Sequence, residues 1–475
     1  MTLNELVSVL NGIAWGPWML ILLVGTGVFL SAKVGFIQFT KFGYAIKNTL
    51  GKVFQKQEAG AGEVTPFQAM TTALAATVGT GNIAGVTGAI AVGGPGAVFW
   101  MWISALFGMV TKYAEVVLAV RYRERNAKGD WVGGPMYYIK NGLGEKWKPL
   151  AAVFSMLGAL CAFGIGNMTQ VNTIAGAINN AIDTFGGNTG ASTLVFFGQT
   201  VPVSSLVVGA VVALIVALVL FGGIKRIGAV TEKMVPFMAA VYIVCALAVV
   251  VTNFGALGKI FAMIFKGAFS AEAALGGAVG ITIMTTIQKG VGRGVFSNEA
   301  GLGSAPMAHA ATSETDPVKQ GMYGIFEVFM DTIVICTLTA LTLLCGVEAG
   351  VDITWGASAG AELISAAFST VFGQLGALII AVGIGLFALS TILSWSLYGT
   401  RCCEFLLGTK AVPVYQTIFI AVIVIGATLE LELVWNIADT LNGFMAIPNL
   451  IALLGLSGVV VKLTKDYFAK ETLSK

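Results

Sequence analysis

This sequence has little charge. Only 11% of its 475 residues are charged, against roughly 25% in soluble domains, and its mean hydropathy is +0.86. Runs of about 20 apolar residues recur from end to end, and each is long enough to cross a bilayer core of roughly 30 Å. These features exclude an ordinary cytosolic enzyme. Because the runs are continuous rather than alternating, they indicate a polytopic helical membrane protein and not a barrel.

Histidine and paired cysteines are also scarce. The single histidine, His309, excludes a bis-histidine haem centre. The six cysteines are scattered without any CxxC motif, so neither a disulfide framework nor a zinc site is indicated. No catalytic constellation is clustered either, and the sequence therefore predicts a protein that is not an enzyme.

The apolar runs define eleven expected transmembrane spans. They lie at residues 13–32, 64–92, 96–120, 150–180, 204–222, 230–252, 262–290, 320–345, 375–400, 413–429 and 433–461. The first run lacks a basic leader and a small-residue cleavage site, so it is expected to remain as an uncleaved helix.

The basic residues predict the orientation in the cell membrane. Nearly all of the 27 Lys and Arg residues fall on one side of the eleven-span arrangement, Lys289 and Arg293 among them. Lys259 and Lys266 fall on the other side, and Lys112 lies inside a span. By the positive-inside rule, the N-terminus is expected outside and the C-terminus in the cytoplasm.

The spans after the first predict an internal repeat. Five lie in residues 64–252 and five in 262–461, and because five is odd the two halves must be inverted in the membrane. Inverted repeats are typical of secondary transporters, which bind substrate where the first helix of each half is broken. The expected fold is an all-α membrane protein of 11 transmembrane helices, divided into an N-terminal helix and cytoplasmic connection (1–63), two five-span repeats (64–253 and 254–461) and a cytoplasmic tail (462–475).

The stretch "ATVGTGNIAGVTG" at 76–88 nearly matches a dinucleotide-binding fingerprint. That interpretation fails because no strand precedes Gly79 and no acidic residue lies about 20 positions later. Close helix packing through Gly81 and Gly85 remains an alternative on spacing alone.

A broken helix is the other interpretation of this stretch. Glycine lowers the cost of leaving helical geometry, and freed backbone groups at membrane depth are tolerated only where they line a cavity or bind something. A half-helix N-terminus would attract a carboxylate and the freed carbonyls could bind a cation. Thr77, Thr80 and Asn82 supply neutral polar side chains beside both.

A matching break is expected in the span 262–290, at Gly276, Gly277 and Gly280. The rival stretch "GVGRG" at 290–294 would bring Lys289 and Arg293 to the midplane, at about 2.5–3.5 kcal/mol each. With the break at 276–280, both basic residues are expected near the cytoplasmic interface, and 290–294 is interpreted as the entry to a loop.

Three motifs of this sequence resemble motifs of known transporters. "VGTGNI" at 78–83 resembles the unwound segment of the first core helix in transporters with the leucine-transporter fold. "GGPMYYI" at 133–139 and "RGVFSNEAGLGSAP" at 293–306 resemble signatures of the alanine or glycine:cation symporter family, also called sodium:alanine symporters. The resemblance covers essentially the whole chain. It implies uptake of alanine and glycine driven by sodium, on a leucine-transporter-like five-plus-five fold with one extra N-terminal helix.

The resemblance also implies the site residues. A sodium beside the substrate would be bound by Asn82, and a second sodium by backbone carbonyls and a hydroxyl pair. A carboxylate-contacting tyrosine of the superfamily has no match here, so Gln170 is expected in its place, with Asn167 in reserve. The expected substrate-binding residues are Gly79, Thr80, Gly81, Asn82, Gln170, Gly276, Gly277 and Gly280, and the expected sodium ligands are Ala75, Thr77, Val78, Asn82, Ser390 and Thr391.

Two carboxylates four residues apart, Glu327 and Asp331, are expected on one helix face. They could couple transport to a proton or cation, but an ion pair with Lys112 is favoured, because a neutral sodium site needs no carboxylate. Asp439 is interpreted as a gate or cap, and His309 as a solvated or structural residue.

The leading functional hypothesis is a secondary active symporter for small neutral amino acids. Its expected partners are alanine or glycine, sodium as the coupling ion and the lipid bilayer, without a nucleic acid; a monomer is compatible with the sequence. The alternative is a proton-coupled amino-acid transporter of the same fold, but neither Ser390 nor Thr391 titrates. A channel is disfavoured because filter motifs are absent.

Overall fold

The computed structural model describes residues 3–49, 51, 58–196, 199–270, 281–429 and 432–473. In these ranges eight helices are long and apolar enough to cross a membrane, and a ninth span results if one bent helix pair is counted. The chain is thus a mostly helical membrane protein, as predicted. The count of eleven spans and the inverted repeat remain predictions.

The elements up to the middle of the chain are α1 (Leu3–Ala14), α2 (Pro17–Lys33), α3 (Ile37–Thr40), α4 (Phe42–Thr49), α5 (Pro66–Thr77), η2 (Gly81–Gly85), α6 (Val86–Gly93), α7 (Ala97–Arg121), β1 (Glu124–Arg125), β2 (Trp131–Val132), α8 (Pro135–Tyr138), η3 (Ile139–Leu143), η4 (Glu145–Trp147), α9 (Lys148–Phe163), η5 (Gly164–Met168), α10 (Thr169–Thr184), η6 (Thr189–Ala191), β3 (Thr193–Phe196), β4 (Gln199–Pro202), α11 (Val203–Leu220) and α12 (Gly223–Thr252). The later elements are η7 (Phe254–Ala256), α13 (Leu257–Gly267), α15 (Ile283–Asn298), α16 (Pro306–His309), α17 (Pro317–Val328), η8 (Phe329–Cys336), α18 (Thr337–Glu348), α19 (Ala361–Phe372), α20 (Leu375–Leu407), α21 (Val412–Gly426), α22 (Glu432–Gly455) and α23 (Ser457–Leu473). The strands form two antiparallel pairs, β1 with β2 and β3 with β4.

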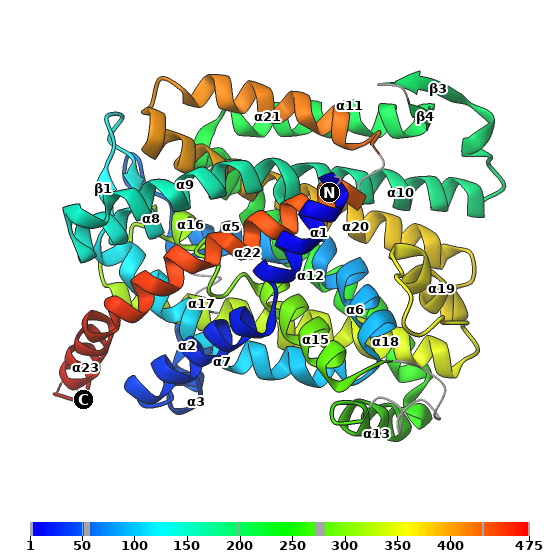
Figure 1. The fold of residues 1–475 in the computed structure, drawn as a ribbon, viewed down its shortest axis with the longest axis horizontal. Helices are drawn as coiled ribbons and strands as arrows, with labels where there is room; N and C mark the ends of the chain where they lie inside the picture. The colour runs from blue at the N-terminus through cyan, green and yellow to red at the C-terminus, as the bar shows by residue number, and fades with distance from the viewer. Residues whose placement is uncertain are drawn as a thin grey trace.

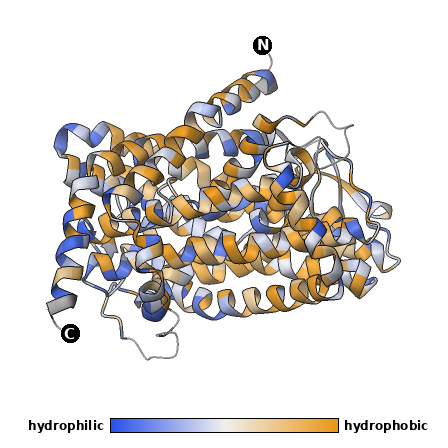
Figure 2. Ribbon diagram, turned by 90° about the horizontal axis from the view of Figure 1, so that it is seen from below, coloured by the Kyte–Doolittle hydropathy of each residue, from blue (hydrophilic) through white to orange (hydrophobic). Residues whose placement is uncertain are grey.

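The helices enclose the bent pair α5–α6. α12, α20 and α16 pack against α5, and α15 and α18 pack against α6. α11 and α21 lie together along one side of the molecule and α13 lies on the opposite side (Figure 1). Figure 2 shows that hydrophobic residues run along most of the long helices, as membrane insertion requires. The bent pair is therefore buried among helices rather than exposed to lipid.

Local sequence signals begin the helices on either side of the site. Thr65 and Gln68 form a reciprocal capping box before α5, and Pro66 occupies its first turn. Asp316 accepts hydrogen bonds from two backbone N–H groups of α17, and Pro317 opens that helix. Both helix starts are thus fixed by residues that satisfy otherwise unpaired N–H groups.

The predicted span 262–290 is wrong. α13 ends at Gly267, and the next described helix, α15, continues past residue 290 to Asn298. Residues 271–280, which include the glycines expected at the second break (Gly276, Gly277 and Gly280), lie outside the described residues. The expected loop entry at 290–294 is also wrong, because this stretch is helical.

Packing against α7 explains the glycines of α15. A Cβ added to Gly290 would overlap the Ala97 carbonyl oxygen and lie 2.6 Å from Trp100 Cβ, and one added to Gly294 would overlap the Ser104 hydroxyl. Small residues let two membrane helices approach closely, and here they serve that purpose without breaking the helix.

We expect Gly290→Ala to destabilise the protein by about 1–3 kcal/mol, because the added methyl group would force α15 away from α7. Gly292→Ala in the same helix is the matched control, since the nearest atom to its added Cβ lies 3.9 Å away. Thermal unfolding of the two purified variants in detergent checks this. Equal stabilities would contradict the packing role.

Candidate functional site

The helix break predicted at 78–83 is confirmed. α5 ends at Thr77 and η2 begins at Gly81, and the two halves are bent by 48°. The Val78 N–H donates to Leu74 O (2.7 Å) and the Thr77 hydroxyl donates to the same carbonyl (3.2 Å), so both complete the end of α5. The intervening backbone is buried at the centre of the molecule.

Asn82 links the break to η8. Its side-chain oxygen accepts the Gly79 N–H (2.9 Å), and its amide nitrogen donates to Asp331 Oδ1 (2.6 Å). The same nitrogen lies 3.3 Å from Cys336 Sγ, which also contacts the Ser297 hydroxyl at 3.3 Å. Asn82 therefore joins the freed backbone to a carboxylate that the sequence did not assign to it.

Gln170 reaches the break. Its Oε1 accepts the Thr80 hydroxyl (3.0 Å) and lies 3.4 Å from the Thr80 N–H. Gln170 is itself held by Ile165 O, to which it donates at 2.9 Å. The reserve residue, Asn167, instead donates to Phe419 O on α21 (2.7 Å) and does not face the break.

The hydroxyl pair on α20 faces the end of α5. Ser390 and Thr391 donate to the Ala75 carbonyl oxygen, at 3.2 and 3.0 Å, and both also bond back to Phe387 O in their own helix. A Cβ added to Gly79 would overlap Thr391 Oγ1. Two hydroxyls and a backbone carbonyl thus converge, which is an oxygen-rich arrangement of the kind that hard cations prefer.

A second interruption lies beside the first, between α15 and α16. Its backbone turns through positive φ at Glu299 (57°), Gly301 (93°) and Gly303 (83°). Phe296 and Ser297, at the end of α15, lie 3.5 and 3.9 Å from the position of a Cβ on Gly81. This interruption spans residues 299–305, inside the motif that carried the family resemblance.

Two buried carboxylates fix this second break. Glu115 Oε1 accepts the backbone N–H groups of Gly301 (3.0 Å) and Gly303 (3.1 Å) and the Asn449 amide (2.6 Å). Glu299 accepts the Trp395 indole N–H at 2.9 Å and the hydroxyl of Ser304. Neither glutamate was predicted as a site residue, although the spacing of the two glycines after Glu299 could have indicated a break.

The predicted ion pair of Glu327 or Asp331 with Lys112 is wrong. Glu327 Oε1 pairs with His309 Nε2 at 2.5 Å, and Asp331 bonds to Asn82. Lys112 Nζ makes no hydrogen bond or ion pair with any of the described residues, although its side chain is fully buried. His309 is likewise fully buried, and so it is a structural residue rather than a solvated one.

A cavity of about 630 Å³ lies at the α6 end of the break. Its lining includes Gly85, Lys289, Arg293 and Asp439, and the Arg293 guanidinium stacks 4.8 Å from the ring centroid of Phe296. Lys289 and Arg293 thus lie at the same end of the molecule as Asp439.

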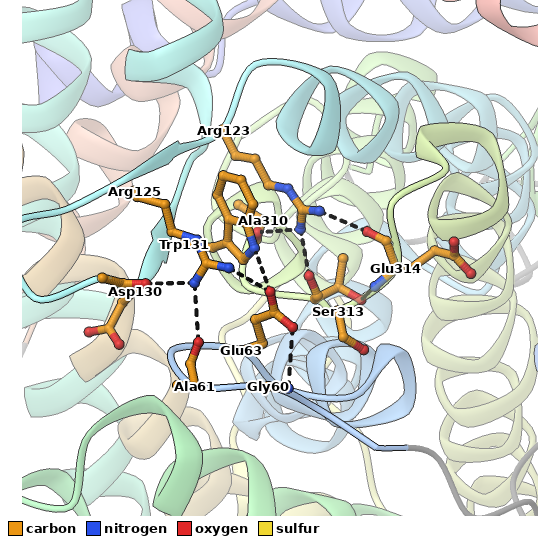
Figure 3. A network of polar contacts seen from close by, with 12 residues as sticks. Gly60, Ala61, Glu63, Arg123, Arg125, Asp130, Trp131, Ala310, Ser313 and Glu314 are labelled. Carbon is orange, nitrogen blue, oxygen red and sulfur yellow. Dashed lines mark hydrogen bonds and ion pairs between the residues drawn. The ribbon is translucent and has the colours of Figure 1, made fainter.

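The opposite end of the molecule is closed by a network that we call the end clamp, residues 60–64, 123–131 and 310–314 (Figure 3). Trp131 lies between the guanidinium groups of Arg123 (4.3 Å) and Arg125 (4.1 Å) and donates to Glu63 (3.0 Å). Arg123 donates to three backbone carbonyls of residues 310–314. Val64 pairs with Thr312. The clamp thus joins the segment before α5 to the segment after α16.

We expect the clamp to contribute pH-dependent stability through Glu63. Burial alone would raise the pKa of Glu63, but hydrogen bonds from Trp131, the Gly60 N–H and Arg125 hold it below its usual 4.5. A lowered pKa stabilises the fold above 4.5, and this contribution is lost as the pH falls through the folded-state pKa. Glu63→Gln should therefore cost less than about 1 kcal/mol at pH 7, since Arg125 is partly exposed, and the difference from wild type should shrink below about pH 4.

Thermal unfolding at pH 7 and at about pH 3 measures this. Glu145→Gln is the control, because Glu145 pairs only with the exposed Lys148 among the described residues. A wild-type-to-variant difference that stays constant across this pH range would contradict the assignment to Glu63.

Comparisons with known proteins agree with this architecture. The model of the sodium:alanine symporter family matches residues 1–475. The chain is similar to the sodium/alanine symporter AgcS of Methanococcus maripaludis, with 47% identity over 98% of this chain and 97% of that protein. It is also similar to the amino-acid carrier protein AlsT of Bacillus subtilis, with 38% identity over 98% and 92% of the two chains. The fold is similar to that of MhsT, crystallised with L-phenylalanine, with a TM-score of 0.57 and 12% identity over 87% of this chain and 99% of that one. From its sequence and its fold, the chain belongs to the sodium:alanine symporter family.

Proposed function

We propose that this protein takes up alanine or glycine together with sodium by alternating access. The observation that carries the proposal is the broken helix α5–α6, where freed backbone groups meet Gln170 on one side and the hydroxyl pair of α20 on the other. Family membership and the name of the Methanococcus relative support both the substrate class and the coupling ion.

The substrate carboxylate would bind at the backbone of Gly79, Thr80 and Gly81. A half-helix N-terminus presents N–H groups and a partial positive charge, which together favour an anion. Thr80 offers a hydroxyl beside its N–H, and the ring of Phe296 next to Gly81 limits the space for a substrate side chain. Small amino acids therefore fit this site best.

Sodium would bind at two places. One is beside Asn82, next to the substrate, and the other lies between the Ala75 and Val78 carbonyls and the hydroxyls of Ser390 and Thr391. Because sodium and the substrate carboxylate would both bind the freed groups around one break, each would strengthen the binding of the other.

The cavity with Lys289 and Arg293 would then be the extracellular entrance, and the end clamp would close the cytoplasmic side. This orientation places the N-terminus outside and the C-terminus in the cytoplasm. In this arrangement residues 64–253 and 254–461 form two inverted repeats, and sodium leaves toward the cytoplasm after substrate binding has closed the entrance.

Alanine uptake into proteoliposomes tests the proposal, with an inward gradient of sodium, of potassium or of protons alone. We expect saturable uptake that depends on sodium and is lost in Asn82→Ala and in the double variant Ser390→Ala/Thr391→Ala. Ser396→Ala is the matched control on α20, since its hydroxyl bonds back to Leu393 O within the same helix. Uptake driven equally well by protons alone would overturn the assignment of sodium.

A further inference from the structure

A cluster of buried charges lies beside the second break and is not used by the proposed sodium sites. Its carboxylates are Glu115 on α7, Glu299 at the break, Asp331 on η8 and Glu327 on α17, each at most 2% exposed. Lys112 lies on α7 three residues before Glu115, and so on the same face of that helix. The cluster therefore combines one lysine with carboxylates from separate elements.

The negative charges outnumber the positive ones. His309 Nε2 lies 2.5 Å from Glu327 Oε1, and its Nδ1 lies 2.9 Å from the Gln320 amide nitrogen. Among the described residues around the cluster, Lys112 and His309 are thus the basic groups set against four carboxylates. Isolated charges are costly at membrane depth, so each remaining carboxylate must either hold a proton or be balanced by a bound cation.

Lys112 does not form a conventional ion pair with any of these groups. The stem of its side chain lies against α17, where a Cβ added to Gly324 would come within 3.0 Å of Lys112 Cγ. Its Nζ has no hydrogen-bond partner among the described residues, and neither has Glu115 Oε2. The ammonium is thus held by its stem in a buried position, without a fixed partner among the described residues.

We propose that Lys112 is a tethered cation, which takes the place of one dissociable cation in the charge balance of the transport site and so sets how many coupling ions the protein binds. The inference rests on the proposed cation-coupled transport. Its role is positioning and charge balance, because Lys112 is not placed among the groups that contact substrate.

The hydrogen bonds of Glu115 allow a clean test. All three donors to Glu115 reach Oε1, whereas Oε2 has none among the described residues. In Glu115→Gln the amide oxygen can accept the same three hydrogen bonds, and the NH₂ group takes the position of Oε2. This variant therefore removes one negative charge and keeps the contacts, and Lys112→Met removes the positive charge while keeping most of the apolar stem.

The two single variants should shift the cation dependence of alanine uptake in opposite directions. In Lys112→Met the cluster takes up one more sodium, so the Hill coefficient for sodium rises by about one. In Glu115→Gln the ammonium is no longer balanced, and the apparent sodium affinity falls by about tenfold or more. The double variant Lys112→Met/Glu115→Gln restores the wild-type sodium dependence. Glu348→Gln, which removes a carboxylate paired with Lys259 outside the cluster, leaves it unchanged.

The sodium-dependent rise in melting temperature of each purified variant gives a second readout that needs no transport. If Lys112→Met does not fold, the sodium dependence of Glu115→Gln and of the double variant still tests the proposal. Wild-type sodium dependence in Glu115→Gln, or a double variant no better than that single variant, would overturn the proposal and leave Lys112 a packing residue. Each titration uses the cation whose gradient drives alanine uptake by the wild type. If that cation is the proton, the proposed sodium coupling is refuted, and a proton titration of the same variants still tests Lys112.

Discussion

Gly79→Ala is expected to reduce alanine uptake by at least about 100-fold while the protein still inserts and folds. The added Cβ would overlap Thr391 Oγ1 and lie 3.4 Å from Gln170 Oε1. Thr391 cannot withdraw without losing its hydrogen bond to the Ala75 carbonyl. The methyl group would therefore spread the break just where substrate and sodium are proposed to bind, and misplacement by about 1 Å is enough for such a loss.

Uptake into proteoliposomes, normalised to the protein inserted, measures this effect. Gly25→Ala in α2 is the matched control, because no atom lies within 4 Å of its added Cβ. Thermal unfolding should show a cost of only about 1–3 kcal/mol for Gly79→Ala, as for other overpacked sites. Transport at the wild-type rate by Gly79→Ala would show that the break does not form the transport site.

The second large effect is expected from the Asn82–Asp331 pair. Asn82→Asp would place two carboxylates within hydrogen-bond distance of each other in a fully buried site, where like charges cannot both ionise. Asp331→Asn would remove the negative charge that holds the Asn82 amide. Each single variant should cost about 3 kcal/mol in substrate binding, which corresponds to about 100-fold in affinity.

Exchanging the two residues tests the hydrogen bond itself. In Asn82→Asp/Asp331→Asn the carboxylate at 82 can accept both the Gly79 N–H and the new amide at 331, so alanine binding should recover by at least about tenfold over either single variant. Binding is measured by calorimetry at saturating sodium. Strictly additive losses in the double variant would refute a direct coupling between these side chains.

The first break was predicted from the sequence, whereas the interruption at 299–305 was not. At 78–83, glycines alternate with polar residues inside an apolar run, and few other structures explain that combination. In α15 the glycines at 290 and 294 look similar, but they serve close packing against α7. Helix-packing glycines and helix-breaking glycines differ in what lies opposite them, and this information is not local in sequence.

The prediction that Glu327 and Asp331 share one helix face was wrong for a different reason. Glu327 and Asp331 are four residues apart, which predicts one shared face in an α-helix. The wider π-helical segment η8 begins at Phe329, between them, and it changes the angle between successive residues. Glu327 therefore faces His309 whereas Asp331 faces Asn82. Asn167 lies in another such segment, η5, which turns it away from the break that Gln170 reaches.

The end clamp has a consequence for the order in which the chain assembles. Its contacts among Glu63, Arg125 and Trp131 join residues of the first half, and they can form as soon as that half is synthesised. The bonds of Arg123 and Val64 to residues 310–314 must wait for most of the remaining chain. Chains fold as units during synthesis, from the N-terminus onward. The first half therefore forms part of the end clamp during its own synthesis. The clamp is completed only after residues 310–314 have been synthesised.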